Sequence, residues 1–129
     1  CAKAQDIIER ALDARWDTEL VALYADCTGG DATGQIARGE QWLKRHPQDA
    51  ALLLVLGRLC ARQGLWGKAQ SYLEASLSVE ESHSAHLLLA ELHEKAERPD
   101  AAQRHYRKGL DLALAQLREV TGDRRKPAL

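Results

Sequence analysis

The chain has few of the residues that bend, cross-link or interrupt a polypeptide. It has no Phe, no Met, only three Pro and three Cys among 129 residues. A chain rich in Ala, Leu, Glu, Arg and Gln with little Pro favours helix. Cys1, Cys27 and Cys60 are widely spaced and odd in number, which argues against a disulfide framework or a zinc site and favours a reducing compartment.

Strong charge and long apolar runs are also lacking. The formal net charge is -1, which gives no overall electrostatic footprint for nucleic acid. No apolar run approaches the ~20 residues of a membrane span, and no signal peptide is visible. A hydrophobic content of 45% is enough for the core of one domain. Because the chain begins with Cys1 and not with Met, we expect an excised fragment, which leaves open a membrane anchor or another domain upstream.

Motifs of catalysis are missing as well. The sequence holds no GxSxG, no HExxH and no P-loop, because the glycine-rich stretch 29–34 is not followed by GK[ST]. We interpret that stretch as an interhelical loop. We therefore expect a protein that is not an enzyme, with no catalytic residue and no metal site.

Apolar residues recur at helical spacing almost throughout the chain. Helix-capping residues and breakers divide the pattern into about seven segments. Leu52 to Leu56 are apolar on every side, so their helix needs neighbours on several faces. The expected helices cover about 4–12, 18–24, 33–45, 49–63, 67–79, 83–96 and 100–119, with a basic tail over 120–129.

The sequence repeats itself with a shift of 33 residues, which carries Gly57 onto Ala90. Small residues coincide with small ones and bulky with bulky. The matching pairs are Leu56 with Leu89, Leu59 with Leu92, Ala69 with Ala102, Leu73 with Tyr106 and Leu77 with Leu110. The same helix-turn-helix unit is therefore used twice.

This period and these small residues resemble the tetratricopeptide repeat. Its Leu-Gly pair appears as Leu56-Gly57, and its early alanine in the second helix as Ala69 and Ala102. The first unit departs from the pattern, with Leu23 where a small residue is expected. The resemblance implies an all-α, right-handed superhelix of antiparallel helix pairs. We expect one domain over 1–119, with 1–15 as the second helix of a preceding unit, a degenerate repeat over 16–49, and repeats over 50–82 and 83–119.

Three longer segments resemble the C-terminal part of the HemY family over about residues 16–114: 41–47 followed by 51–59, then 64–77, then 105–110. These are bacterial inner-membrane proteins linked to haem biosynthesis. The resemblance implies two membrane helices upstream and a scaffold that recruits haem-pathway enzymes. It implies attachment to the inner membrane through that anchor, and the unpaired cysteines favour its cytoplasmic side slightly.

In such a superhelix the first helix of each pair lines an inner groove that binds peptides or amphipathic helices. The repeat register predicts that this wall presents Leu20, Tyr24, Leu54, Arg58, Arg62, Leu87 and Glu91. We therefore expect partners that are proteins or peptide segments, with no nucleic acid.

A second function, haem or porphyrin carriage, stays open beside the scaffold. His83 and His86 share one helix face, His93 lies two turns beyond His86, and Cys60 is the repeat counterpart of His93. Imidazole or thiolate can ligate haem iron, but no CxxCH or Cys-Pro is present and packing explains these positions more simply. No cofactor is therefore assigned.

Trp66 lies between Gly64 and Gly67, at the turn between two expected helices. It is either a recognition residue or a structural peg. Because the repeat register places Pro99 at the equivalent site, we interpret Trp66 as a peg whose ring wedges between helices.

Overall fold

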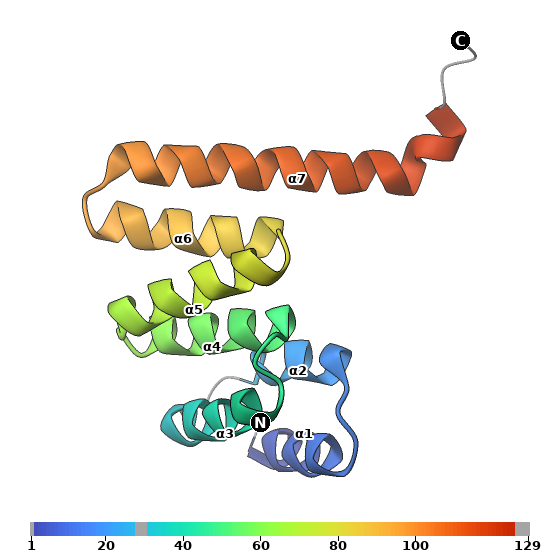
Figure 1. Ribbon diagram of the computed structural model, residues 1–129, viewed down its shortest axis with the longest axis vertical. Coiled ribbons are helices and arrows are strands. Elements are labelled where there is room, and N and C mark those ends of the chain that lie inside the picture. Colours follow the sequence, from blue (N-terminus) through green and yellow to red (C-terminus); the bar gives the residue numbers. More distant parts are fainter. Residues whose placement is uncertain (1, 28–30, 126–129) are drawn as a thin grey trace. The chain divides into compact units, whose positions relative to one another are not determined.

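The computed structural model describes residues 2–27 and 31–125, and within them the chain forms seven helices and no strand. The helices are α1 (Ala2–Ala14), α2 (Thr18–Tyr24), α3 (Ala32–Arg45), α4 (Ala50–Arg62), α5 (Trp66–Val79), α6 (His83–Lys95) and α7 (Pro99–Arg125), labelled in Figure 1. Contacts divide the chain between Glu81 and Ser82 into a first and a second unit, which are described separately. The all-α expectation is confirmed.

Side-chain caps begin four of the helices, because the first turn of a helix leaves backbone N–H groups unpaired. The carboxylates of Asp17, Asp31 and Asp49 accept hydrogen bonds from the N–H groups of residues 19, 34 and 52, at the starts of α2, α3 and α4. Ser82 accepts from the N–H of Ala85 at the start of α6. The expected starts of α2, α3 and α4 are confirmed.

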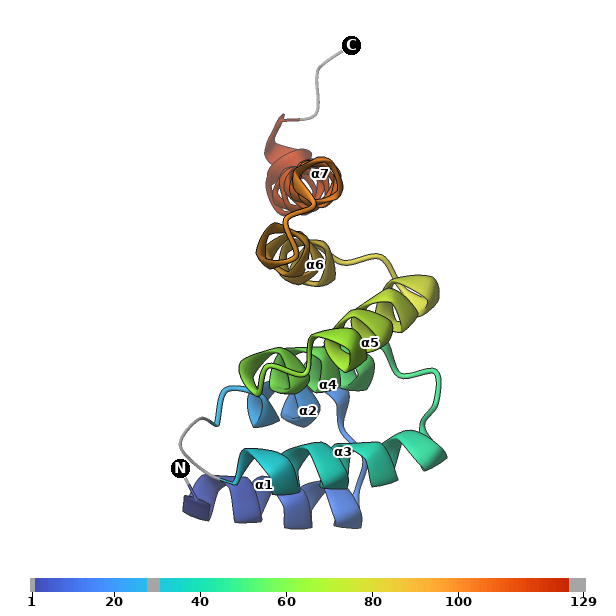
Figure 2. The same cartoon turned by 90° about the vertical axis from the view of Figure 1, so that its left-hand side faces the viewer.

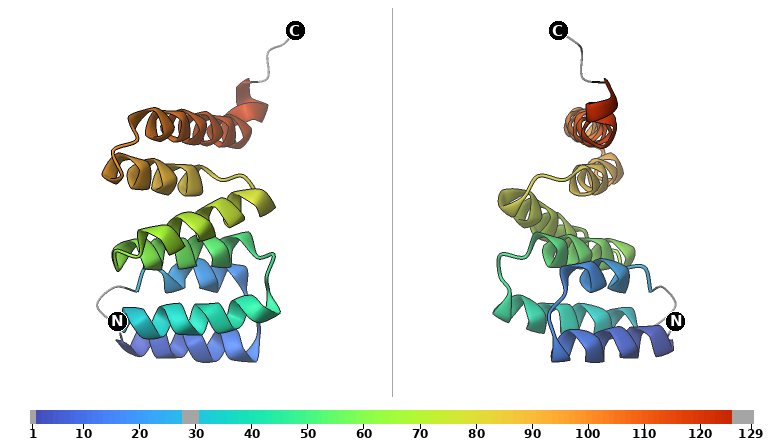
Figure 3. Two further views of the ribbon diagram at one scale, coloured as in Figure 1. Left: turned by 60° about the vertical axis from the view of Figure 1, so that its left-hand side comes forward. Right: turned by 90° about the vertical axis from the view of Figure 1, so that its right-hand side faces the viewer.

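In the first unit, α1 and α3 form one layer and α2 and α4 lie beside it (Figures 2 and 3). The centre of the unit is α4, which contacts α2, α3 and α5. Its side chains Leu52, Leu53, Val55, Leu56 and Leu59 are all buried. The expectation that this all-round apolar helix has neighbours on several faces is confirmed.

The α4–α5 pair is close because small residues lie where the helices meet. A Cβ added to Gly57 would come within 2.7 Å of the Leu73 side chain, which packs directly over the glycine backbone. Ala69 on α5 is fully buried beside it. The small residues of the repeat therefore mark the place where α4 and α5 approach each other.

The second unit consists of α6 and α7, which run antiparallel to each other (Figure 1). Ala90 and Ala102 are buried. The end of α7 was wrongly predicted, because the helix continues past Glu119 to Arg125. Because α6 has 13 residues and α7 has 27, α6 is about 20 Å long and α7 about 40 Å long. Roughly half of α7 therefore extends past α6.

The turn that follows α4 contains a left-handed residue, Gly64, with φ of +73°. After it, the N–H of Leu65 donates to the carbonyl of Cys60 at 2.9 Å. Such a bond back to the last turn is the usual C-terminal stop of a helix, and it favours glycine at the left-handed position.

The turn that follows α6 has the same geometry with a different residue. The N–H of Arg98 donates to the carbonyl of His93 at 2.8 Å. The left-handed residue is Glu97, with φ of 58°, which is the one non-glycine residue with positive φ among those described. A side chain at this φ costs about 1–2 kcal/mol of backbone strain.

Two further expectations concern the membrane and the cysteines. In the parts of the chain described, no helix has the length and apolar character needed to cross a bilayer. Cys60 is a free, buried thiol, but Cys27 is buried and disulfide-bonded. The expectation of unpaired cysteines is therefore wrong for Cys27, because pairing depends on distance in the fold and not on sequence spacing.

Candidate functional site

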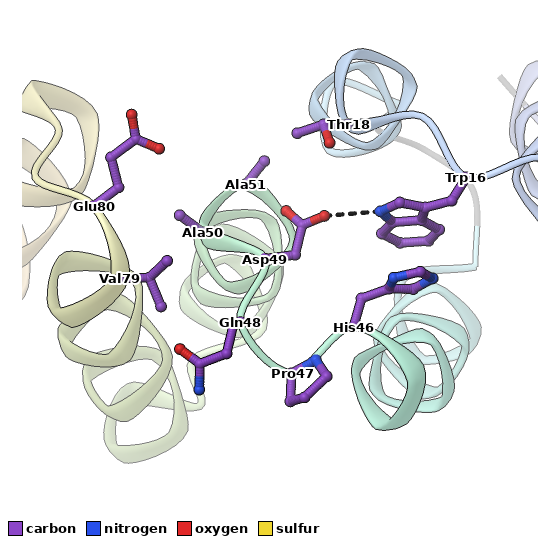
Figure 4. Close-up of a pocket in the computed structure, with 10 residues that line it drawn as sticks. All are labelled: Trp16, Thr18, His46, Pro47, Gln48, Asp49, Ala50, Ala51, Val79 and Glu80. Atoms are coloured by element: carbon purple, nitrogen blue, oxygen red, sulfur yellow. Dashed lines mark hydrogen bonds between the residues drawn. The ribbon is translucent and has the colours of Figure 1, made fainter.

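A candidate site in the first unit is a cleft of about 530 Å³ where helix ends meet (Figure 4). It lies among the starts of α2 and α4 and the ends of α3 and α5. Its wall consists of Trp16, Thr18, His46, Pro47, Gln48, Asp49, Ala50, Ala51, Val79 and Glu80. The lining holds two carboxylates and neither Lys nor Arg, so an occupant that carries a positive charge is favoured over an anion.

Trp16 forms one side of this cleft and is held from two directions. Its indole stacks on the His46 ring with centroids 4.0 Å apart, and it meets Trp42 edge-on at 5.7 Å. Its Nε1–H donates to Asp49 Oδ2 at 2.8 Å, as Figure 4 shows. Asp49 Oδ1 accepts from the N–H of Leu52, so one carboxylate both caps α4 and anchors the indole.

Of the groove residues predicted on α4, the two arginines hold α4 to the end of α2. Arg58 Nη2 lies 3.1 Å from Asp26 Oδ1. Arg62 donates to the backbone carbonyl of Ala25. Cations suit the C-terminal end of a helix, where carbonyl groups are unpaired. Both side chains therefore have a structural task in addition to any contact with a partner, and Leu54 lies half-buried on the same helix.

Two predicted groove residues, Leu20 and Tyr24, belong to α2, and Tyr24 is not exposed to a partner. It is fully buried, and its hydroxyl donates to Glu9. Burial and the Glu9 carboxylate raise the pKa of the Tyr24 phenol. A side chain with no exposed surface cannot contact a partner, so Tyr24 is a core residue and the prediction that it lines the groove is wrong. Leu20, the other predicted groove residue on α2, is half-buried.

The predicted groove residues Leu87 and Glu91 lie on α6, in the second unit, and both are exposed. Leu87 also packs against α7, because a Cβ added to Gly109 would come within 3.2 Å of the Leu87 side chain. Leu87 therefore serves the α6–α7 contact as well as the surface.

The haem-ligand candidates on α6 face a histidine that the sequence analysis missed. His86 and His93 are buried, and His105 on α7 contacts both of them. His83 is half-buried at the start of α6. The signal for His105 was present, because His86 and His93 are two turns apart on one face and a facing helix must place a residue between them.

Cys60 is a poor ligand in this conformation. It is fully buried in α4, and burial raises the pKa of its thiol, which keeps it in the protonated form that does not bind metal. Across residues 2–27 and 31–125, no group of three or more His, Cys, Asp and Glu side chains is arranged to hold a metal ion.

The interpretation of Trp66 as a buried peg is wrong, since 44% of its surface is exposed. It is the first residue of α5, one position beyond the turn that ends α4. Its place at the start of α5, and not in the middle of the helix, puts it at the tip of the α4–α5 hairpin. Leu65 beside it is 43% exposed.

A second apolar surface runs along α7. Leu110, Leu114, Leu117 and Val120 are between 45% and 82% exposed. Their spacing of four, three and three residues puts them on one helix face. This α7 stripe, made of these four residues, was missed because residues from 120 onward were assigned to a tail, Leu110 was matched to Leu77 of the repeat, and Leu114 and Leu117 were given no role.

No family model and no curated protein matches this chain.

Proposed function

We propose that the chain is a non-catalytic protein–protein interaction module whose α7 stripe binds an amphipathic helix of a partner. One observation carries the proposal: four large apolar side chains on one face of a single helix are 45–82% exposed. Apolar patches of this kind are rare on surfaces that face only water, and they mark contact sites.

The length of α7 supports a helical partner. The stripe begins near the point where α7 outruns α6, and about half of α7 extends past α6. An isolated helix shorter than ~12–15 residues is marginal in water and is stabilised chiefly by packing of its apolar face. A partner helix with apolar residues at matching three- and four-residue steps would supply that packing.

The charges beside the stripe favour a protein over a lipid surface. Between Leu110 and Val120 they are Asp111, Arg118 and Glu119, of mixed sign. Helices that lie on anionic membranes instead carry a polar face rich in Lys and Arg.

The fold proposed for the module is tetratricopeptide-like. Its support is the 33-residue repeat, the helix pairs α4–α5 and α6–α7, and the small residues Gly57, Ala69, Ala90 and Ala102 at their contacts. Such folds present helix faces to peptide and helical partners.

The partners proposed are enzymes of haem synthesis, and the module would be attached to the bacterial inner membrane through an upstream anchor. This part rests on the sequence resemblance to the HemY family alone. The cytoplasmic side rested on unpaired cysteines, and the disulfide at Cys27 removes that reason. Haem carriage is not proposed, because His86 and His93 are buried and a haem would reach them only by displacing the residues that cover them.

Binding of purified haem-pathway enzymes to the immobilised chain tests both parts of the proposal. We expect at least one enzyme to bind, and Leu117→Glu to weaken that binding about tenfold or more, as for the loss of an apolar anchor. Gln116→Glu is the matched control, since it adds the same charge at the next exposed position, and it should change affinity less than about twofold.

The two possible failures are distinguishable. If no enzyme binds, the haem-pathway partner is refuted. If an enzyme binds Leu117→Glu as tightly as the unaltered chain, the stripe is not the contact surface. Because Leu117 is 59% exposed, both variants should keep the helical circular dichroism spectrum of the parent.

A further inference from the structure

Three imidazoles meet inside the α6–α7 pair. His86 Nδ1 lies 2.9 Å from His105 Nδ1. The rings of His93 and His105 are stacked, with centroids 5.4 Å apart. His86 and His93 are buried, and His105 is half-buried. The three side chains form a histidine cluster that joins the two helices of the second unit.

The 2.9 Å contact between the Nδ1 atoms of His86 and His105 depends on how many protons these two rings carry. One Nδ1 must donate its proton and the other must accept through its lone pair. This arrangement holds when both rings are neutral, and also when one ring carries an extra proton at Nε2. If both rings are protonated, both Nδ1 atoms carry a hydrogen, no lone pair remains between them, and two like charges face each other.

The surroundings of His105 make a positive charge there more costly. The charged and titratable groups that act on it are His86 and His93 from α6 and Arg104 and Lys108 from its own helix, all of them basic. The carboxylates of Glu91 and Glu94 on α6 act instead on Tyr106, which hydrogen-bonds Glu94.

We propose that the histidine cluster makes the α6–α7 pair acid-sensitive: α7 stays packed on α6 while His86 and His105 share at most one extra proton, and separates when both rings are charged. The device is independent of the proposed partner, because it depends only on contacts within the second unit. At acid pH, α7, which carries the α7 stripe, would separate from α6.

The direction of the pH dependence follows from the folded state. Burial, with His86 and His93 next in importance, lowers the pKa of His105. A base with a lowered pKa in the folded state binds its proton more tightly when unfolded. Its stabilising contribution is therefore present above the ordinary histidine pKa of about 6.5 and is lost as the pH falls below it.

Amide hydrogen exchange of the intact chain, read by mass spectrometry at about pH 7.5 and about pH 5, tests the proposal. After correction for intrinsic exchange rates, we expect protection of α6 and α7 to fall about tenfold or more at the lower pH, because the helix pair opens there. His105→Gln keeps a hydrogen-bonding side chain but cannot bind a proton, and its loss should stay below about threefold. The control is His83→Gln, the same change on α6 outside the cluster, which should respond like the unaltered chain.

Two results would overturn the proposal: protection of α6 and α7 that is equal at both pH values, or an acid response that His105→Gln leaves unchanged. If His105→Gln does not fold at about pH 7.5, His86→Gln replaces it, because this change removes the other ring of the pair that cannot hold two extra protons. An acid response of undiminished size in His86→Gln would then overturn the proposal, and a weakened one would support it.

Discussion

Replacing glycine by alanine at one left-handed turn residue, and glutamate by glycine at the other, should change stability in opposite directions. Gly64 and Glu97 occupy equivalent positions after α4 and α6, with φ of +73° and 58°. A side chain at such φ costs about 1–2 kcal/mol, and glycine costs about 0.5–1 kcal/mol through the extra freedom of the unfolded chain. Nothing lies within 4 Å of a Cβ placed on Gly64, so no steric clash adds to the strain there.

The net effects follow from these two contributions. Gly64→Ala should lower the free energy of unfolding of the first unit by about 1 kcal/mol. Glu97→Gly should raise that of the second unit by about 0.5–1 kcal/mol, because the relief of strain exceeds the gain in unfolded-state freedom. Glu97→Ala is the control: it removes the carboxylate but keeps the strain, so it should gain little.

The units need separate readouts. All three Trp residues lie in the first unit, so urea unfolding followed by tryptophan fluorescence reports on Gly64→Ala. Amide exchange of α6 and α7 at low denaturant reports on the Glu97 variants. A neutral Gly64→Ala, or a Glu97→Ala variant that gains as much as Glu97→Gly, would refute the argument that backbone strain decides both effects.

Three further substitutions test the first unit by urea unfolding. Trp16→Phe should lower the free energy of unfolding by about 1.5–3 kcal/mol, since it removes the hydrogen bond to the Asp49 carboxylate; a loss below about 0.5 kcal/mol would contradict this. Tyr24→Phe should cost about 1–3 kcal/mol, because Glu9 loses its hydroxyl donor, and a stabilised variant would refute that bond. Trp66→Ala should cost about 1–2 kcal/mol because the ring is half exposed, and a loss above about 3 kcal/mol would place it in the core.

Much of the fold follows from local chemistry. Aspartates before apolar runs gave the starts of α2, α3 and α4, because a carboxylate that accepts from the first turn is a local signal. The all-round apolar pattern of α4 predicted neighbours on several faces, because an apolar face left in water is unfavourable. The 33-residue repeat predicted where Gly57 lets two helices approach.

The features that sequence analysis missed depend on distances between segments. The disulfide at Cys27 and the contact of His86 with His105 both require two parts of the chain to meet. The exposure of the Trp66 side chain depends on the angle at which the chain leaves the turn before α5. The register also gave Tyr24 a surface position, whereas packing of α1 against α2 covers it.

The repeat register predicted which residues line a groove but not what those side chains contact within the chain. Arg58 and Arg62, which it placed in the groove, bind the end of α2 in addition to any contact with a partner. The α7 stripe was visible as leucines at helical spacing. Its exposure was not, because that depends on how far α7 extends past α6.

The position of α4 sets how substitutions are tolerated along the first unit. Three helices lie against α4, whereas among the described residues α1 lies on α2 and reaches α3 through Asp13, and α5 lies on α4 and reaches α3 through Tyr72. A substitution in α1 or α5 therefore has to satisfy two neighbouring helices, while one in α4 has to satisfy three at once. In a saturation mutagenesis screen for folded protein, the profile of permitted residues should be narrowest along α4 and widen on both sides of it.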